Sequence, residues 1–195
     1  MAASGRHGTG VDKRRVILDA AITVFARALG AARSGDVAGA RESIEQLTAL
    51  REALVAANEA YWAEQVDIQH EVALAWIARA EGRDDEALAL LRATADREDA
   101  TDKHPVTPGP IVPARELLGE LLLELGQPAQ ALEAFERSHA AEPNRFRGLY
   151  GAARAAELLG DPEKARTYYT ALLELVARAD TERTELQRAR AFLAS

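Results

Sequence analysis

Apolar residues recur along this chain at the spacing of helix faces, and no segment alternates between apolar and polar residues long enough to be a β-strand. Alanine, leucine, glutamate and arginine dominate the composition, which favours helix. Short breaks containing glycine, proline or acidic residues interrupt the pattern. The pattern therefore predicts an all-α protein, with helices over residues 12–33, 37–56, 59–81, 84–98, 113–125, 128–141, 145–159, 162–178 and 181–193.

Four of these breaks share one arrangement, in which a glycine ends one helix and an alanine follows five residues later in the next. Glycine can adopt the left-handed conformation that ends a helix. Because the connections are short, successive helices should lie antiparallel. The glycine and alanine pairs are Gly35 and Ala40, Gly82 and Ala87, Gly126 and Ala131, and Gly160 and Ala165. This recurrence predicts a helical repeat array.

The spacing of the glycines gives the repeat length. Gly126 and Gly160 are 34 residues apart, whereas the two earlier intervals are 44 and 47 residues. A 34-residue unit of two helices is typical of tetratricopeptide repeats. The longer intervals require additions, and we assign these to a Pro-rich insertion at about 99–113 and to helix extension through 51–65.

Residues 21–178 resemble the tetratricopeptide repeat family, most closely in the last two repeats. The matching residues are Leu118, Gly119, Leu122, Gly126, Ala131, Phe135 and Pro143 in the third repeat, and Ala152, Ala153, Ala156, Gly160, Ala165, Tyr169 and Leu172 in the fourth. The resemblance implies helical hairpins forming a right-handed superhelix, with a groove lined by the first helix of each repeat. Inside a helix Gly119 costs about 1 kcal/mol relative to alanine, so we expect a close helix approach there. The last predicted helix should cap the array.

A shorter resemblance covers Arg14–Arg27, which is similar to the opening helix of Tet-repressor family regulators. That family continues with a helix-turn-helix and a recognition helix, whereas residues 28–40 of this chain contain the repeat turn. A transcription regulator is therefore one alternative function.

Composition limits the other classes of protein. Residues 1–11 are small and polar, so we expect a disordered tail or an expression remnant, followed by a single repeat domain over 12–195. No run reaches the roughly 18 apolar residues of a membrane span. The chain has no cysteine, which fits cytosol and periplasm equally, and we expect it in the cytoplasm. Its formal net charge of -7 argues against a nucleic-acid partner.

No catalytic constellation is recognisable, so we expect neither an enzyme nor a metal or other cofactor. No two histidines have the spacing of a helical zinc site. The most unusual segment is the Pro-rich insertion, which contains His104. Because long loops between packed helices are often functional, a ligand-sensing or regulatory domain of a larger protein is a second alternative.

The groove implied by the family resemblance supplies the remaining candidate residues. They are Trp76, Arg79, Glu116, Glu120, Arg147, Tyr150 and Arg154. The spacing of Arg147, Tyr150 and Arg154 keeps them on one helix face. Arginine binds carboxylates through two parallel hydrogen bonds, so an acidic protein or peptide would suit this groove. The sequence therefore predicts a non-catalytic scaffold that binds a protein or peptide, and it leaves the oligomeric state open.

Overall fold

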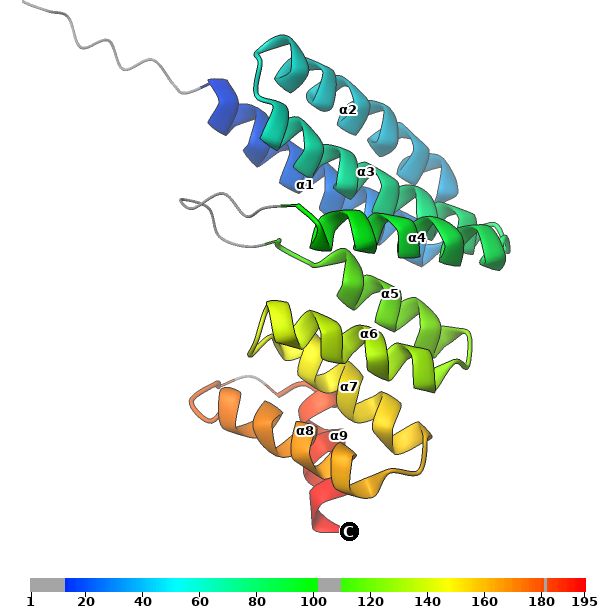
Figure 1. Ribbon diagram of the computed structural model, residues 1–195, viewed down its shortest axis with the longest axis vertical. Helices are drawn as coiled ribbons and strands as arrows, with labels where there is room; N and C mark the ends of the chain where they lie inside the picture. Colours follow the sequence, from blue (N-terminus) through cyan, green and yellow to red (C-terminus); the bar gives the residue numbers. More distant parts are fainter. Residues whose placement is uncertain (1–12, 102–109, 181) are drawn as a thin grey trace, which may run out of the picture. The chain divides into compact units, whose positions relative to one another are not determined.

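The computed structural model describes residues 13–101, 110–180 and 182–195. These residues form nine helices and no strand (Figure 1). The helices are α1 (Lys13–Ser34), α2 (Val37–Ala56), α3 (Ala60–Ala80), α4 (Asp84–Asp99), α5 (Ala114–Glu124), α6 (Pro128–Ala141), α7 (Phe146–Leu158), α8 (Pro162–Leu175) and α9 (Thr184–Ala194). The all-α prediction is confirmed, and the largest differences are the earlier end of α8 and the later start of α9.

All four predicted turn glycines have a left-handed backbone. Their φ angles are 84° at Gly35, 77° at Gly82, 70° at Gly126 and 72° at Gly160. In each turn the following residue donates its backbone N–H to a carbonyl five residues earlier, as Gln127 does to Leu122 at 2.8 Å. This hydrogen bond satisfies a carbonyl that the helix end leaves unpaired. The glycines thus end one helix and allow the chain to reverse into the next.

The chain divides into two compact units, residues 1–87 (unit 1) and residues 88–195 (unit 2), and the division falls within α4. In unit 1, helices α1, α2 and α3 each pack against the other two. In unit 2, α5 packs on α6, α6 on α7, α7 on α8 and α8 on α9. A single domain over 12–195 stays a prediction, and the expected tail at 1–11 lies outside the described residues.

Several small residues are buried where the helices pack. The alanines five positions after the turn glycines, Ala40, Ala87, Ala131 and Ala165, have no exposed surface. In unit 2 the buried ring of Phe135 lies against two glycines: a Cβ atom would come within 2.7 Å of the ring at Gly119 and within 2.2 Å at Gly151. The predicted close approach at Gly119 is therefore confirmed. The missing Cβ atoms make room for the aromatic ring between α5 and α7.

In unit 1 the Gly35 turn joins α1 directly to α2. The side chain of Asp36 caps α2 by accepting the backbone N–H of Gly39 at 3.0 Å. The segment Arg14–Arg27 lies within α1, and α1 and α2 pack as a long hairpin. The similarity to Tet-repressor regulators is thus limited to one helix, and a transcription-regulator role stays a prediction.

Candidate functional site

In unit 2, α5 and α7 are the first helices of two successive repeats. An ion pair joins them on one face. Arg147 of α7 donates from Nε to Glu120 Oε1 at 2.8 Å and from Nη2 to Glu120 Oε2 at 2.6 Å. The Arg147 side chain is 39% exposed and that of Glu120 is 20% exposed. Arg147, which the sequence analysis assigned to a partner's carboxylate, is therefore already engaged by a carboxylate of this chain.

Glu157, near the end of α7, is the centre of a second cluster on this face. It accepts hydrogen bonds from Arg188 Nη2 of α9 at 2.6 Å and from the Tyr169 hydroxyl of α8 at 2.8 Å. Arg154 Nη1 lies 2.5 Å from Glu157 Oε2. Burial of Glu157 favours its neutral form, but the hydrogen bonds from Arg188 and Tyr169 and the ion pair with Arg154 outweigh burial and lower its pKa to about 2. One permanently charged carboxylate is thus shared by two guanidinium groups.

Arg188 is a member of this face that the sequence analysis missed. The 34-residue period could have found it, because Glu120, Arg154 and Arg188 stand 34 residues apart. They lie on α5, α7 and α9, so α9 has the place of a first helix of a further repeat. The predicted capping helix therefore also adds a charged residue to this face.

Glu116 is buried, although it was predicted to line the groove. Arg145, which precedes α7, donates from Nε to Glu116 Oε1 at 2.7 Å and from Nη2 to the Ile111 carbonyl at 2.7 Å. Burial raises the pKa of Glu116, and the charge of Arg145 opposes this shift. A Cβ atom at Gly148 would lie 3.1 Å from Glu116 Oε1, so the glycine makes room for the carboxylate. Glu116 in this structure supports the packing of α5 and is not a surface contact.

Tyr150 is the aromatic member of the predicted groove in unit 2. Its side chain is half-buried, and its ring centroid lies 6.4 Å from that of Tyr169. The structure therefore brings five predicted residues together on α5 and α7. They are Glu116, Glu120, Arg147, Tyr150 and Arg154.

Trp76 and Arg79 belong to α3 of unit 1. Trp76 is a core residue with 2% exposure, and the Arg33 guanidinium lies 4.4 Å from its ring centroid. Arg79 donates to Asp84 at 2.8 Å. Both residues are thus engaged within unit 1. His104 lies outside the described residues, so its role in ligand binding stays a prediction.

Two further observations concern the described part of the chain. None of its helices has the length and apolar character needed to cross a membrane. Within the same residues, no group of three or more acidic or histidine side chains is placed to hold a metal ion.

Comparison with known proteins bears on the repeat assignment. Residues 117–181 match the family model of the tetratricopeptide repeat. No curated protein matches the sequence. The crystal structure of PcrH from Pseudomonas aeruginosa is 22% identical with a TM-score of 0.51, over 66% of this chain and 89% of that chain. PcrH in complex with the chaperone binding region of PopB has the same identity and TM-score, over 65% and 94%.

A structure of MamA AMB-1 is 18% identical with a TM-score of 0.47, over 86% of this chain and 96% of that chain. At 22% identity the likeness to PcrH concerns the fold alone, and it agrees with the hairpin packing described above. The turn glycines, the buried small residues and the family match lead to one conclusion: the chain has an all-α fold of helical hairpins and contains tetratricopeptide repeat sequence at residues 117–181.

Proposed function

We propose that this chain is a non-catalytic scaffold that binds an acidic, extended segment of a partner protein on the face formed by α5, α7 and α9. The observation that carries the proposal is the unequal charge around Glu157, where Arg154 and Arg188 share one carboxylate. The chain as a whole has a formal net charge of -7, so this excess of positive charge is a local exception. A carboxylate from a partner would balance it.

The exposure and geometry of Arg188 support this assignment. Its side chain is 46% exposed, and its hydrogen bonds to Glu157 use Nε and Nη2. A guanidinium group has five N–H donors, so Arg188 can bind a second carboxylate while keeping the first. Tyr150 adds a half-buried ring for apolar contact. By contrast, the Arg147 and Glu120 charges are balanced, so we expect a smaller contribution from that pair.

The likeness to PcrH supports the same class of function. PcrH has been solved in complex with the chaperone binding region of PopB. A protein of this fold therefore holds a segment of another protein, and we extend that mode of binding to the present chain by proposal.

The test compares acidic and neutral peptides in a binding titration with the parent chain and with the Arg154→Ala, Arg188→Ala double variant. We expect the acidic peptides to bind the parent and the double variant to bind them at least about tenfold more weakly, which corresponds to about 1.4 kcal/mol. Higher salt should weaken parent binding, since exposed charge pairs are screened over about 8–10 Å.

Arg190→Ala is the matched control, because Arg190 is an exposed arginine on α9 that pairs with Glu182 at 3.6 Å. Circular dichroism should show that every variant is folded. Equal affinity of the parent and the folded double variant would show that the binding surface does not include the arginines of α7 and α9.

A further inference from the structure

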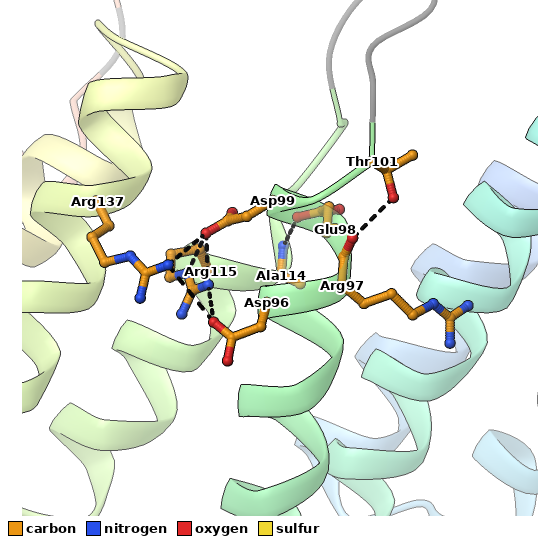
Figure 2. Close-up of polar contacts among 8 residues, drawn as sticks. All are labelled: Asp96, Arg97, Glu98, Asp99, Thr101, Ala114, Arg115 and Arg137. Carbon is orange, nitrogen blue, oxygen red and sulfur yellow. Dashed lines mark hydrogen bonds and ion pairs between the residues drawn. The ribbon is translucent and has the colours of Figure 1, made fainter.

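The start of α5 is held by a side chain from α4. Helix α5 follows Pro113, whose side chain makes no capping hydrogen bond. Instead, Glu98 Oε2 accepts the backbone N–H of Ala114, the first residue of α5, at 2.6 Å (Figure 2). An N–H in the first turn of a helix has no partner within the helix, so Glu98 supplies the cap from outside.

Two arginine side chains also stabilise this junction, but they bind Asp96 and Asp99 and not Glu98. The buried Arg115 donates from Nη2 to Asp96 and to Asp99, each at 2.6 Å (Figure 2). Arg137 of α6 donates to Asp99 at 3.2 Å. The two aspartates thus receive the guanidinium hydrogen bonds, whereas the hydrogen bond at Glu98 comes from an uncharged amide.

The charges around Glu98 come from α4, from α5 and from the residue that follows α6. Asp99 lies on α4, Glu142 follows α6, and Arg115 lies on α5. Burial is the main influence and raises the pKa of Glu98 to about 7, although the Ala114 N–H opposes the shift. Asp99 and Glu142 raise the pKa of Glu98 further, and Arg115 lowers it. Near neutral pH this carboxyl group therefore exists in both protonation states.

We propose that the α4–α5 junction is a pH-responsive joint, in which ionisation of Glu98 weakens the hold of α4 on the first turn of α5. The neutral carboxyl group keeps a carbonyl oxygen that accepts the Ala114 N–H. Ionisation places a negative charge in a half-buried site beside Asp99 and Glu142, which favours moving the side chain toward water. Helix α5 also carries Glu120, the partner of Arg147, so the joint acts on the helix beneath the proposed binding face.

The direction of the pH effect follows from the raised pKa in the folded state. The stabilisation from Glu98 is fully present below about 4.5, its ordinary pKa, and is lost as the pH rises through about 7. The junction should therefore be firmest at mildly acidic pH and loosen at alkaline pH.

Hydrogen exchange of the amides of residues 114–117 tests the joint at pH 5.5 and 8.5, after correction for the intrinsic pH dependence of exchange. In the parent, protection should fall at least about tenfold between the two values, since one pKa unit corresponds to a tenfold change in equilibrium. In Glu98→Gln, whose amide oxygen still accepts the Ala114 N–H without a charge, protection should remain high at both. In Glu98→Ala, which lacks the acceptor, protection should be low at both.

Glu133→Gln, at an exposed glutamate on α6, is the matched control and should behave as the parent does. The same pH dependence in the parent and in Glu98→Gln would overturn the proposal. Loss of protection in Glu98→Gln at both pH values would also overturn it, because the charge itself would then be the stabilising feature. None of these outcomes depends on peptide binding, so the proposed function is tested separately.

Discussion

Unit 1 and the later repeats of unit 2 use the same turn but differ in helix length. Helices α1, α2 and α3 have 22, 20 and 21 residues, whereas α5 to α8 have 11 to 14. The family match covers 117–181, in unit 2. In unit 2, prolines begin α6 and α8 directly after the turns. In unit 1, α2 continues to Ala56 and is followed by Asn58, which has a φ of 57°. The longer repeat of unit 1 thus comes from longer helices and not from a different turn.

The two units also differ in how their helices fit together. In unit 2 the buried ring of Phe135 meets the bare backbones of Gly119 and Gly151. The residue of unit 1 at the position of Phe135, nine after the turn glycine, is the half-buried Ile44. At Gly30 of α1, a Cβ would have no atom within 4 Å apart from the neighbouring backbone of its own helix. Unit 2 therefore depends on one close fit, whereas unit 1 distributes its packing over three long helices.

The largest expected effect is the loss of this aromatic ring. Phe135→Ala should cost about 3–5 kcal/mol of unfolding free energy, because a cavity would remain between two glycines. Ile44→Ala in unit 1 should cost about 1–2 kcal/mol, because Ile44 is only half-buried. Urea unfolding followed by circular dichroism measures both. Equal losses would mean that the two units do not differ in the way described.

The glycine that faces the ring should be the next most sensitive position. Gly119→Leu should cost about 1–3 kcal/mol, since its side chain would overlap the Phe135 ring. Thermal unfolding of the variant beside the parent provides the measurement. An unchanged melting temperature would show that Gly119 can accept a side chain and that the fit in unit 2 is loose.

Ion pairs should matter more in unit 2 than in unit 1. Glu157→Gln should cost about 1–2 kcal/mol at pH 7, since it removes a carboxylate that accepts hydrogen bonds from Arg188 and Tyr169 and pairs with Arg154. The lowered pKa means that this stabilisation is present above about 4.5 and is lost as the pH falls through about 2. The comparison is Asp67→Asn in unit 1, where Asp67 pairs with Arg51 at 2.8 Å, and its cost should be below about 1 kcal/mol. Urea unfolding at pH 7 and pH 3 should show the Glu157 effect shrinking with acid.

Substitution of Gly30, which lies on an open helix surface, should raise the free energy of unfolding instead of lowering it. Gly30→Ala in α1 should stabilise the chain by about 0.5–1 kcal/mol, because alanine loses less backbone entropy in a helix and nothing would contact its Cβ. The measurement is the midpoint of urea unfolding. Destabilisation would indicate a contact at Gly30 and would make unit 1 resemble unit 2 in its dependence on glycine.

The smallest effect is expected at the Pro-rich insertion. Replacing residues 102–109 by a short Gly-Ser linker should change stability by less than about 1 kcal/mol, because closure entropy changes slowly with loop length. Glu98 and Arg115 already connect the flanking helices through Ala114 and Asp99. Loss of a cooperative unfolding transition would show that the insertion contributes to packing.

Much of the fold could be predicted because its signals are local. A glycine that ends a helix and an aspartate that caps one act within a few residues, as Asp161 does on the Lys164 N–H at 3.0 Å. Gly119 was informative for a related reason, since an unfavourable residue inside a helix indicates a close neighbour. Asp84 also follows a turn glycine, but it lies inside α4 as its first residue and pairs with Arg79 instead of capping the helix. Composition could not distinguish these two uses of one carboxylate.

The sequence by itself therefore determined the helices, their turns and the small residues between them, because backbone conformation and helix spacing are set by near neighbours. Only the tertiary structure decided what the charged residues do. Arg147 meets a glutamate 27 positions away, and Arg188 meets one 31 positions away. Which carboxylate an arginine side chain pairs with depends on the burial of both groups and on the distance between their helices. The local sequence pattern specifies neither the burial of a charged side chain nor its distance to side chains of other helices. The pairing around Glu157 and the cap from Glu98 therefore depend on how the helices pack.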